Sequence, residues 1–241
     1  MRGSFPRGPG SLANAAELDA LKQAAAVRAV AEVESGMVLG LGSGTTAALA
    51  LEALAARISE GLRVVGIPTS EKTAMLARRR GVPLTTFDAH RRIDLTIDGA
   101  DEVDCRTFHL IKGLGGALLR EKIIAAASER MIVVVDESKV VDCLGAHGTL
   151  PVEIVPFGWQ TTLDRLAAMD CQPRLRMIAG EPFRTDGGNY IVDCIITEIA
   201  DPPVLEARLA DTVGVVESGL FIGLASMLVI GRKNGVEVIN Q

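Results

Sequence analysis

Two hydrophobic periodicities alternate along the first 140 residues of the chain. Short continuous apolar runs are typical of strands buried on both faces, and the longer segments between them carry apolar side chains at helical spacing. This pattern predicts strands at residues 37–41, 63–67, 93–98 and 131–135. It predicts helices at residues 12–36, 47–59, 70–80 and 117–128. Strands that alternate with helices indicate βαβ units, and therefore an α/β fold with a parallel sheet.

The pattern changes after about residue 147. Further strands are predicted at residues 152–156, 174–178, 190–197 and 213–222, with helices at 161–169 and 204–211. This β-α-β-β-α-β order is typical of a small ferredoxin-like α+β unit. Strands at 227–230 and 236–239 are expected to return to the first unit. We therefore expect a Rossmann-like catalytic domain, residues 12–146 plus 220–241, with a small α+β domain, residues 147–219, inserted before the C-terminus.

The first eleven residues, MRGSFPRGPGS, are rich in Gly and Pro and have no apolar core, so they do not form a secretory signal. We interpret residues 1–11 as an expression scar or a disordered tail outside the fold. Asn14 followed by Glu17 resembles a capping box at the start of the first helix.

Composition excludes several classes of protein. The net charge of −5 argues against nucleic-acid binding through bulk positive charge, and 3% aromatic residues argue against a base-stacking module. The longest apolar stretches are much shorter than the roughly 20 residues of a membrane span. The four cysteines form no CxxC pair, which indicates reduced thiols in a cytoplasmic protein.

A glycine-rich turn, GLGSGTT at residues 40–46, joins the first predicted strand to the next helix. Glycines let the backbone approach an anion closely, and a helix N-terminus directs free N–H groups toward it. The hydroxyls of Ser43, Thr45 and Thr46 suit a small terminal phosphate. The turn is neither a Walker A loop nor a good dinucleotide fingerprint. A tight strand–helix turn capped by Ser or Thr is the structural alternative.

Acidic residues follow the predicted strand 93–98, at the sheet edge where parallel sheets bind ligands. In the segment DGADE, Asp98 and Asp101 can flank a bound polyol and accept its hydroxyl hydrogens. Asx-turn and helix-cap chemistry is the structural alternative. A Mg²⁺ site is another alternative, because clustered carboxylates suit that ion.

A lysine and a glutamate flank the next glycine loop, KGLGG. Lys112 can place a positive charge near a developing oxyanion. Glu121 lies near the start of a predicted helix, where the helix dipole favours the carboxylate and therefore proton acceptance. The structural alternative is that Glu121 is an exposed glutamate between Arg120 and Lys122 on a solvated face. Lys139 falls at the same sheet edge and could belong to the same site. The structural alternative is that it is an ordinary surface lysine.

The three histidines, His90, His109 and His147, are not at metal-ligand spacing, and no HExxH or GxSxG motif is present. We therefore expect no zinc site and no histidine base. Carboxylates and lysines are the groups left to transfer protons.

The order of the motifs resembles one family. GLGSGTT, TSEKT, DGADEVD, IKGLGGALLREK, DESK, LPVEIVPFGW and DGGNYIVD follow one another as in ribose-5-phosphate isomerases of type A, from about residue 18 to the C-terminus. The resemblance implies interconversion of D-ribose 5-phosphate and D-ribulose 5-phosphate in the pentose phosphate pathway, with no metal or organic cofactor. It also implies a homodimer or homotetramer whose contacts include the small domain.

The resemblance places Glu121 at the position of the catalytic base. Asp98 and Asp101 are expected to position hydroxyls and shuttle their protons, and Lys112 to stabilise a cis-enediolate. Leu114 stands where some members have a further glycine, and Ser43 stands where others have threonine. The substrate-binding residues implied are Lys22, Ser43, Gly44, Thr45, Thr46, Asp98, Gly99, Ala100, Asp101, Lys112, Gly113, Leu114, Gly115 and Lys139.

Two other functions stay open at this point. One is a related sugar-phosphate enzyme, such as an amino-sugar-phosphate isomerase or deaminase. The other is a sensor domain that binds a sugar phosphate without turnover. Such a sensor is normally joined to a helix-turn-helix, for which we expect no room before the first helix, and Glu121 favours an enzyme.

Overall fold

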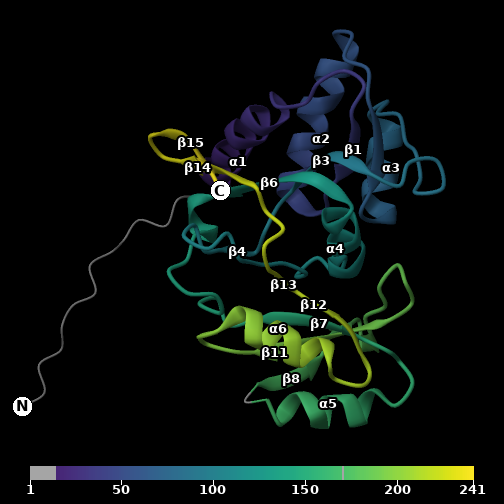
Figure 1. Ribbon diagram of the computed structural model, residues 1–241, viewed down its shortest axis with the longest axis vertical. Helices are drawn as coiled ribbons and strands as arrows, with labels where there is room; N and C mark the ends of the chain where they lie inside the picture. Colours follow the sequence, from purple (N-terminus) through teal and green to yellow (C-terminus); the bar gives the residue numbers. More distant parts are fainter. Residues whose placement is uncertain (1–14, 170) are drawn as a thin grey trace, which may run out of the picture.

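A six-stranded sheet forms the centre of the larger half of the molecule (Figure 1). The computed structural model describes residues 15–169 and 171–241. The strand order is β15-β14-β6-β3-β1-β2, and all neighbours are parallel except the β14–β15 hairpin. The strands are β1 (Val38–Leu41), β2 (Val65–Pro68), β3 (Ile93–Asp98), β6 (Ser128–Asp136), β14 (Met227–Arg232) and β15 (Gly235–Asn240). The predicted parallel sheet is confirmed, and the C-terminal hairpin returns to it as expected.

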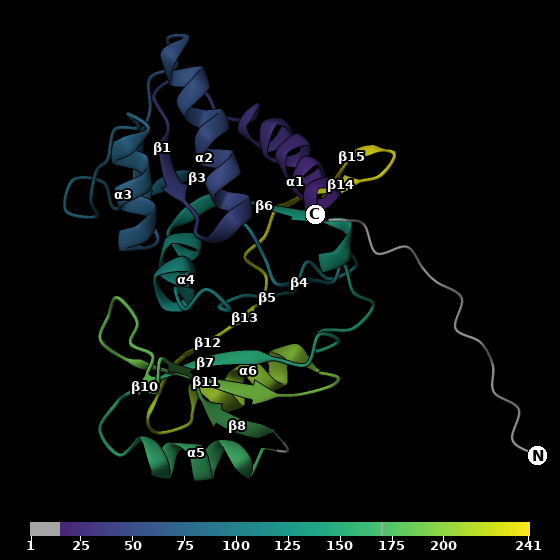
Figure 2. The same ribbon diagram turned by 180° about the vertical axis from the view of Figure 1, so that it is seen from behind.

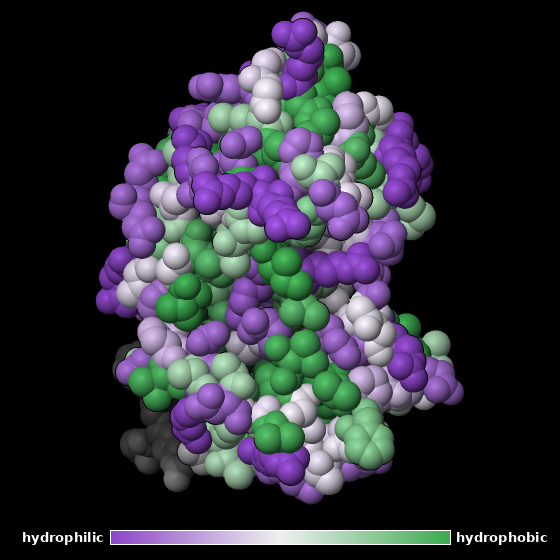
Figure 3. All heavy atoms as spheres, turned by 45° about the vertical axis from the view of Figure 1, so that its right-hand side comes forward, coloured by the Kyte–Doolittle hydropathy of each residue, from purple (hydrophilic) through white to green (hydrophobic). Residues whose placement is uncertain are grey.

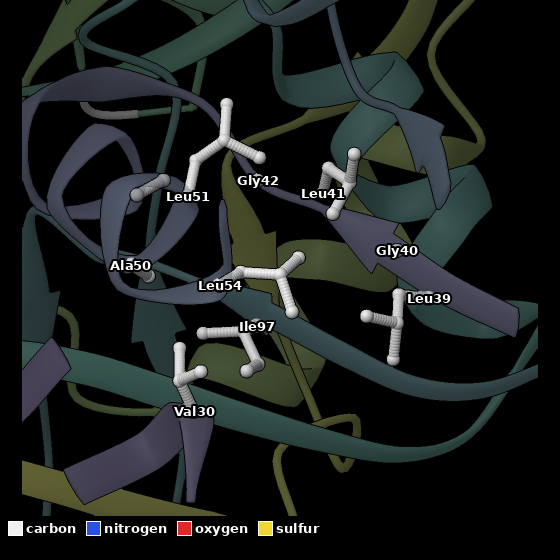
Figure 4. A pocket seen from close by; sticks show the side chains of 10 residues that line it. Val30, Leu39, Gly40, Leu41, Gly42, Ala50, Leu51, Leu54 and Ile97 are labelled. Carbon is white, nitrogen blue, oxygen red and sulfur yellow. The ribbon is translucent and has the colours of Figure 1, made fainter. Parts of the chain in front are cut away.

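Helices cover both faces of this sheet, which explains why its strands read as continuous apolar runs. In β6, Ile132 and Val134 pack in the cluster beneath α1 and α2, while Met131, Val133 and Val135 pack in the cluster on the opposite face. Figure 4 shows aliphatic side chains of α2, β1 and β3 directed toward one another in the first cluster. The helices are α1 (Ala15–Val30), α2 (Gly44–Ser59), α3 (Glu71–Arg79) and α4 (Leu118–Ala126).

A second, antiparallel sheet lies in the smaller half of the molecule (Figures 1 and 2). Its strand order is β12-β7-β11-β8, and its main elements run β-α-β-β-α-β along the chain, as the sequence predicts. Both helices contribute to its buried cluster, α5 through Leu166 and α6 through Leu209. The elements are β7 (Leu150–Ile154), α5 (Trp159–Ala167), β8 (Gln172–Leu175), β11 (Tyr190–Ile195), α6 (Pro202–Ala210) and β12 (Val215–Ser218).

Three two-residue strands form a small sheet between the two larger ones: β4 (Glu102–Val103), β5 (Leu110–Ile111) and β13 (Leu220–Phe221). Strands this short carry no periodicity, so the hydrophobic pattern does not predict them. Directly after β5, the Lys112 N–H donates to the Gly219 carbonyl at 2.9 Å. The small sheet therefore holds the start of the glycine loop, which follows β5, beside the segment that follows β12 of the second sheet.

Several predicted elements differ from the structure. The predicted strand 213–222 is divided between β12 and β13, which belong to different sheets. The first helix ends at Val30 instead of Gly36, because the Arg57 guanidinium binds the carbonyls of Val30 and Val33 at 2.5 and 2.9 Å and satisfies the helix end. The predicted strand 174–178 is divided. β8 ends at Leu175, and β9 (Met177–Ile178) forms a hairpin with β10 (Glu181–Pro182).

The hairpin turns at Ala179 and Gly180, which both have positive φ, as a two-residue type I′ turn requires. The 1–11 tail and the Asn14 cap lie outside the described residues. No described helix is long and apolar enough to cross a membrane.

Candidate active site

A cleft of about 610 Å³ opens at the carboxyl edge of the parallel sheet. Its position is the usual one for ligand sites in open α/β sheets. It gathers groups from α1, the β1–α2 turn, the end of β3, the loop after β5, α4 and the 3₁₀ turn η1 (Glu137–Lys139). The lining residues are Lys22, Ser43, Gly44, Thr45, Thr46, Gly99, Ala100, Asp101, Lys112, Gly113, Gly115, Glu121 and Lys139.

The glycine turn brings the N-terminus of α2 to this cleft. Gly44 has a φ of +88°, which favours glycine, and Ser43 is the N-cap residue but makes no side-chain cap hydrogen bond. Thr45 and Thr46 stand in the first turn, beside N–H groups that have no partner within the helix. This arrangement argues against a turn that Ser43 merely caps, and it suits a bound anion.

The Ser43 hydroxyl lies in a group of hydroxyls that sequence reasoning missed. It contacts the hydroxyls of Thr69 at 2.6 Å, Ser70 at 2.9 Å and Thr73 at 3.1 Å. Thr73 also donates to the Gly42 carbonyl at 3.0 Å. The sequence does contain a sign of this group. Thr69, Ser70 and Thr73 belong to TSEKT, which directly follows β2 at the edge of the sheet where ligands bind. The group holds the glycine turn in place.

Lys112 lies between two buried carboxylates. Its ammonium is 3.0 Å from Oδ2 of Asp98 and 3.5 Å from Oε2 of Glu121, and it donates to the Gly99 carbonyl at 2.6 Å. The exposed fractions of the three side chains are 4%, 1% and 7% for Lys112, Asp98 and Glu121. Glu121 is in the first turn of α4, as predicted, but it is buried and does not lie on a solvated face.

Asp98 does not line the cleft, although the sequence predicted that it would flank a bound polyol. Its Oδ1 accepts hydrogen bonds from the N–H groups of Ser43 and Gly99, at 3.1 and 2.7 Å, and its Oδ2 faces Lys112. A Cβ atom at Gly42 would come within 2.2 Å of Oδ1. The carboxylate is therefore enclosed by the glycine turn and by Lys112, which leaves no open side for a hydroxyl group.

Asp101 does line the cleft, and its Oδ2 accepts a hydrogen bond from the Leu114 N–H at 2.9 Å. The side chain of Leu114 is half exposed and lies in a neighbouring cleft, so the backbone of this residue faces the site. The leucine side chain that stands here in place of a glycine therefore lies outside the main cleft.

Burial changes the acidity of the two carboxyl groups that contact Lys112. It raises the pKa of Glu121 to about 8 and raises the pKa of Asp98, and the Lys112 charge only partly opposes both shifts. Burial alone would lower the pKa of Lys112. The negative charges of Asp98 and Glu121 together have the larger opposite effect, so the pKa is raised and the ammonium stays protonated. Burial therefore opposes the effect expected from the helix dipole, which favours the carboxylate form of Glu121.

Two more lysines stand at the cleft with the start of α2. The Lys22 ammonium is 3.5 Å from Asp19 and 3.9 Å from the buried carboxylate of Asp136, and Lys139 follows in η1. Lys22 from α1 and Lys139 thus add positive charge where the helix N-terminus already favours an anion.

No group of three or more His, Cys, Asp or Glu side chains that could hold a metal ion occurs within residues 15–169 and 171–241. His147 lies beside Glu102, whose buried carboxylate accepts the N–H groups of Gly145 and His147, both at 2.6 Å. These bonds hold the chain between the two larger sheets.

The family model of ribose 5-phosphate isomerase A (phosphoriboisomerase A) matches residues 65–235. The chain belongs to the ribose-5-phosphate isomerase A family. The match spans the acidic segment, the Lys112 loop, α4 and the whole second sheet. Of the motifs that suggested this family by resemblance, all except GLGSGTT at residues 40–46 lie within the matched residues.

Curated relatives and solved structures agree with this assignment. The ribose-5-phosphate isomerase A of Gloeobacter violaceus is 56% identical over 92% of this chain and 97% of its own. That of a Synechococcus strain is 51% identical over 94% and 99%. A D-ribose-5-phosphate isomerase solved in complex with phospho-erythronic acid is 36% identical, with a TM-score of 0.90 over 93% and 99%. The Plasmodium falciparum enzyme is 41% identical, with a TM-score of 0.89 over 92% and 99%.

Replacing Lys112 with methionine tests the buried ion pairs of this site. The free energy of unfolding is expected to fall by about 3–5 kcal/mol at pH 8, because the two buried carboxyl groups lose the cation that stabilises their ionised forms. At pH 5 the loss should be smaller, because both carboxyl groups then take up protons. Urea unfolding followed by circular dichroism at both pH values measures the difference.

Lys72→Met, at an exposed lysine of α3, is the matched control for this substitution. Its unfolding free energy should stay within about 0.5 kcal/mol of the wild-type value at both pH values. A loss in Lys112→Met that is the same at pH 5 and pH 8 would contradict the account.

Proposed function

We propose that this chain interconverts D-ribose 5-phosphate and D-ribulose 5-phosphate, as an aldose–ketose isomerase of the pentose phosphate pathway. The observation that carries the proposal is the shared cleft, which Glu121 and Lys112 line together with the first turn of α2 and two further lysines. A proton-transfer site and an anion site within one small cleft suit a short phosphorylated sugar. Family membership supports the same reaction.

The proposed reaction moves one proton from C2 to C1 of the open-chain sugar through a cis-enediolate. Glu121 in its carboxylate form removes the proton from C2 and returns it to C1. Its pKa of about 8 makes it a stronger base than an exposed glutamate and keeps it close to working pH. The reaction needs the deprotonated form, so the rate rises with pH through that pKa.

Lys112 stabilises the negative charge that develops on the sugar oxygens during this transfer. The cation stays charged because two carboxylates surround it, and it takes the place that a metal ion fills in other isomerisation mechanisms. We therefore propose that the reaction uses no metal or organic cofactor. Asp98 acts through Lys112 and the Ser43 N–H, and so it is a positioning residue here. Asp101 faces the cleft and is the aspartate placed to bind sugar hydroxyls.

The phosphate is proposed to bind at the N-terminus of α2. The N–H groups of the first turn, the hydroxyls of Thr45 and Thr46, and the ammonium groups of Lys22 and Lys139 supply its donors. Binding energy from this fixed anchor can hold C1 and C2 against Glu121 without itself taking part in the chemistry. Gly44, Gly99, Ala100, Gly113 and Gly115 complete the proposed substrate contacts through their backbones.

We further propose two domains: residues 12–146 plus 220–241 as the Rossmann-like domain, and residues 147–219 as an inserted α+β domain. The buried cluster of the second sheet supports this division, because most of its residues lie within 147–219. A homodimer or homotetramer is proposed because apolar side chains of the second unit reach the surface, among them Phe157 at 93% exposed and Val213 at 75%. Figure 3 shows such apolar patches over the middle and lower part of one face.

A cytoplasmic location is proposed with the pathway. Free thiols at all four cysteines support it, because disulfides are rare in reducing compartments. The amino-sugar-phosphate enzyme and the non-catalytic sensor are not favoured, because the family match runs through the Lys112 loop and Glu121.

Glu121→Gln removes proton acceptance and keeps the shape of the side chain. We expect kcat for ribose 5-phosphate to fall by about 10²–10⁴, with the fold and substrate binding intact. A coupled isomerase assay with chelator present measures the rate, and circular dichroism checks the fold. If the variant keeps a third of the wild-type activity, Glu121 is not the base.

Thr46→Val removes one hydroxyl from the phosphate end of the cleft. The KM for ribose 5-phosphate should rise by about 10- to 100-fold, as expected for a lost hydrogen bond to a charged group, while kcat changes much less. Thr197→Val, at an exposed position of the second unit, should leave both constants unchanged. The phosphate anchor is ruled out if the wild-type protein has the same kcat/KM for unphosphorylated ribose as for ribose 5-phosphate.

A further inference from the structure

Arg176 connects the second sheet to the Lys112 loop, which we define as residues 112–116. Its Nε and Nη2 donate to the carboxylate of Asp193 on β11, at 2.9 and 2.5 Å. Its Nη1 donates to the carbonyl oxygens of Gly113 and Leu114, at 3.1 and 3.0 Å. The side chain is 13% exposed. One guanidinium therefore spans from a strand of the second sheet to two successive peptide groups of the loop.

Phe183 holds the other end of the same loop. A Cβ atom on Gly116 would lie 2.4 Å from the Phe183 ring, so the ring rests directly on this glycine. The Arg176 guanidinium lies 5.8 Å from the centre of that ring. The β9–β10 hairpin sets the two residues opposite each other, because the Phe183 N–H donates to the Arg176 carbonyl at 2.9 Å. The hairpin thus contacts the loop at both ends.

The two bound carbonyls determine where the loop's N–H groups point. In a trans peptide, the carbonyl and the N–H of one peptide group point in opposite directions. The Gly113 carbonyl faces Arg176, and the N–H of the same peptide, on Leu114, faces the cleft and donates to Asp101 at 2.9 Å. The Leu114 carbonyl also faces Arg176, so the Gly115 N–H points away from it, on the side where Gly115 lines the cleft.

We propose that Arg176 is a positioning residue for the isomerase reaction. By holding the Gly113 and Leu114 carbonyls, it keeps the Leu114 N–H on Asp101 and directs the Gly115 N–H toward the sugar oxygens on which charge develops. Fixed donors of this kind stabilise an enediolate without reorganising during the reaction. Arg176 does not line the cleft, and Asp193 holds its guanidinium in place. The proposal rests on the proposed function and adds the second sheet to its machinery.

Arg176→Met tests the proposal by keeping much of the side chain's length while removing every donor. The kcat for ribose 5-phosphate should fall by about 10- to 100-fold, the scale of a misplaced catalytic group. The KM should change by less than about threefold, because the phosphate end of the cleft does not contact Arg176. Arg176→Lys should recover part of kcat, since an ammonium can still donate to a carbonyl. Arg165→Met, on the exposed face of α5, is the matched control.

A binding measurement separates positioning from folding. Phospho-erythronic acid, present in the solved relative, is a phosphorylated acid whose carboxylate shares its charge over two oxygens, as an enediolate does. Calorimetry should show its Kd rising in Arg176→Met by about the factor by which kcat falls, while Arg165→Met binds as the wild type does. The proposal is overturned if kcat per folded molecule stays within twofold of wild type, or if the Kd is unchanged.

The two proposals fail in different ways. A wild-type protein with no isomerase activity would refute the proposed function, and the calorimetric comparison would still decide whether Arg176 positions the loop. A wild-type protein that does not bind phospho-erythronic acid at all would overturn both.

Discussion

The ammonium of Lys112, buried between Asp98 and Glu121, is the interaction on which the rest of the site depends. Each partner comes from a different element: the end of β3, the loop after β5 and the first turn of α4. Asp98 also accepts the Ser43 N–H, so the carboxylate that holds Lys112 fixes the glycine turn as well. Gly42 must lack a side chain for the turn to approach this carboxylate. One ion pair therefore links the proton-transfer end of the cleft to its phosphate end.

The same burial produces the chemistry. Asp98 and Glu121 share one cation in a buried space, and burial raises the pKa of both carboxyl groups, that of Glu121 to about 8. An exposed glutamate would be ionised at neutral pH but would be a weak base. The phosphate end is built differently, from helix N–H groups, hydroxyls and partly exposed lysines. Binding and proton transfer are thus assigned to separate groups in one cleft.

Much of this architecture is predictable from the sequence, because parallel strands deliver their carboxyl ends to one edge. That rule alone places the GLGSGTT, DGAD and DESK segments together, and the cleft contains nearly all of the residues expected there. Local patterns do not show what surrounds a side chain in space. The Arg120–Glu121–Lys122 triplet reads as a solvated face, yet Glu121 is buried by the ends of other elements.

The same limit applies to groups that meet across long distances in the chain. Asp98 reads as a polyol-binding acid, but its surroundings enclose it. The hydroxyls around Ser43 come from a different βα unit, and Arg176 reaches the Lys112 loop from 63 residues away. The two-residue strands that join the sheets form only through pairing with distant partners. Periodicity detects elements, and these contacts arise from how the elements are assembled.

Turnover of C2-deuterated ribose 5-phosphate in water, followed by NMR of the ribulose 5-phosphate product, tests most directly whether a buried carboxylate carries the proton. A proton held on Glu121 between C2 and C1 can exchange with water before it is returned. Part of the deuterium should therefore be lost to water, and the reverse experiment in D₂O should place deuterium at C1. Complete retention of the C2 label at every pH, together with activity that depends on added metal ions, would contradict the account and indicate a hydride shift.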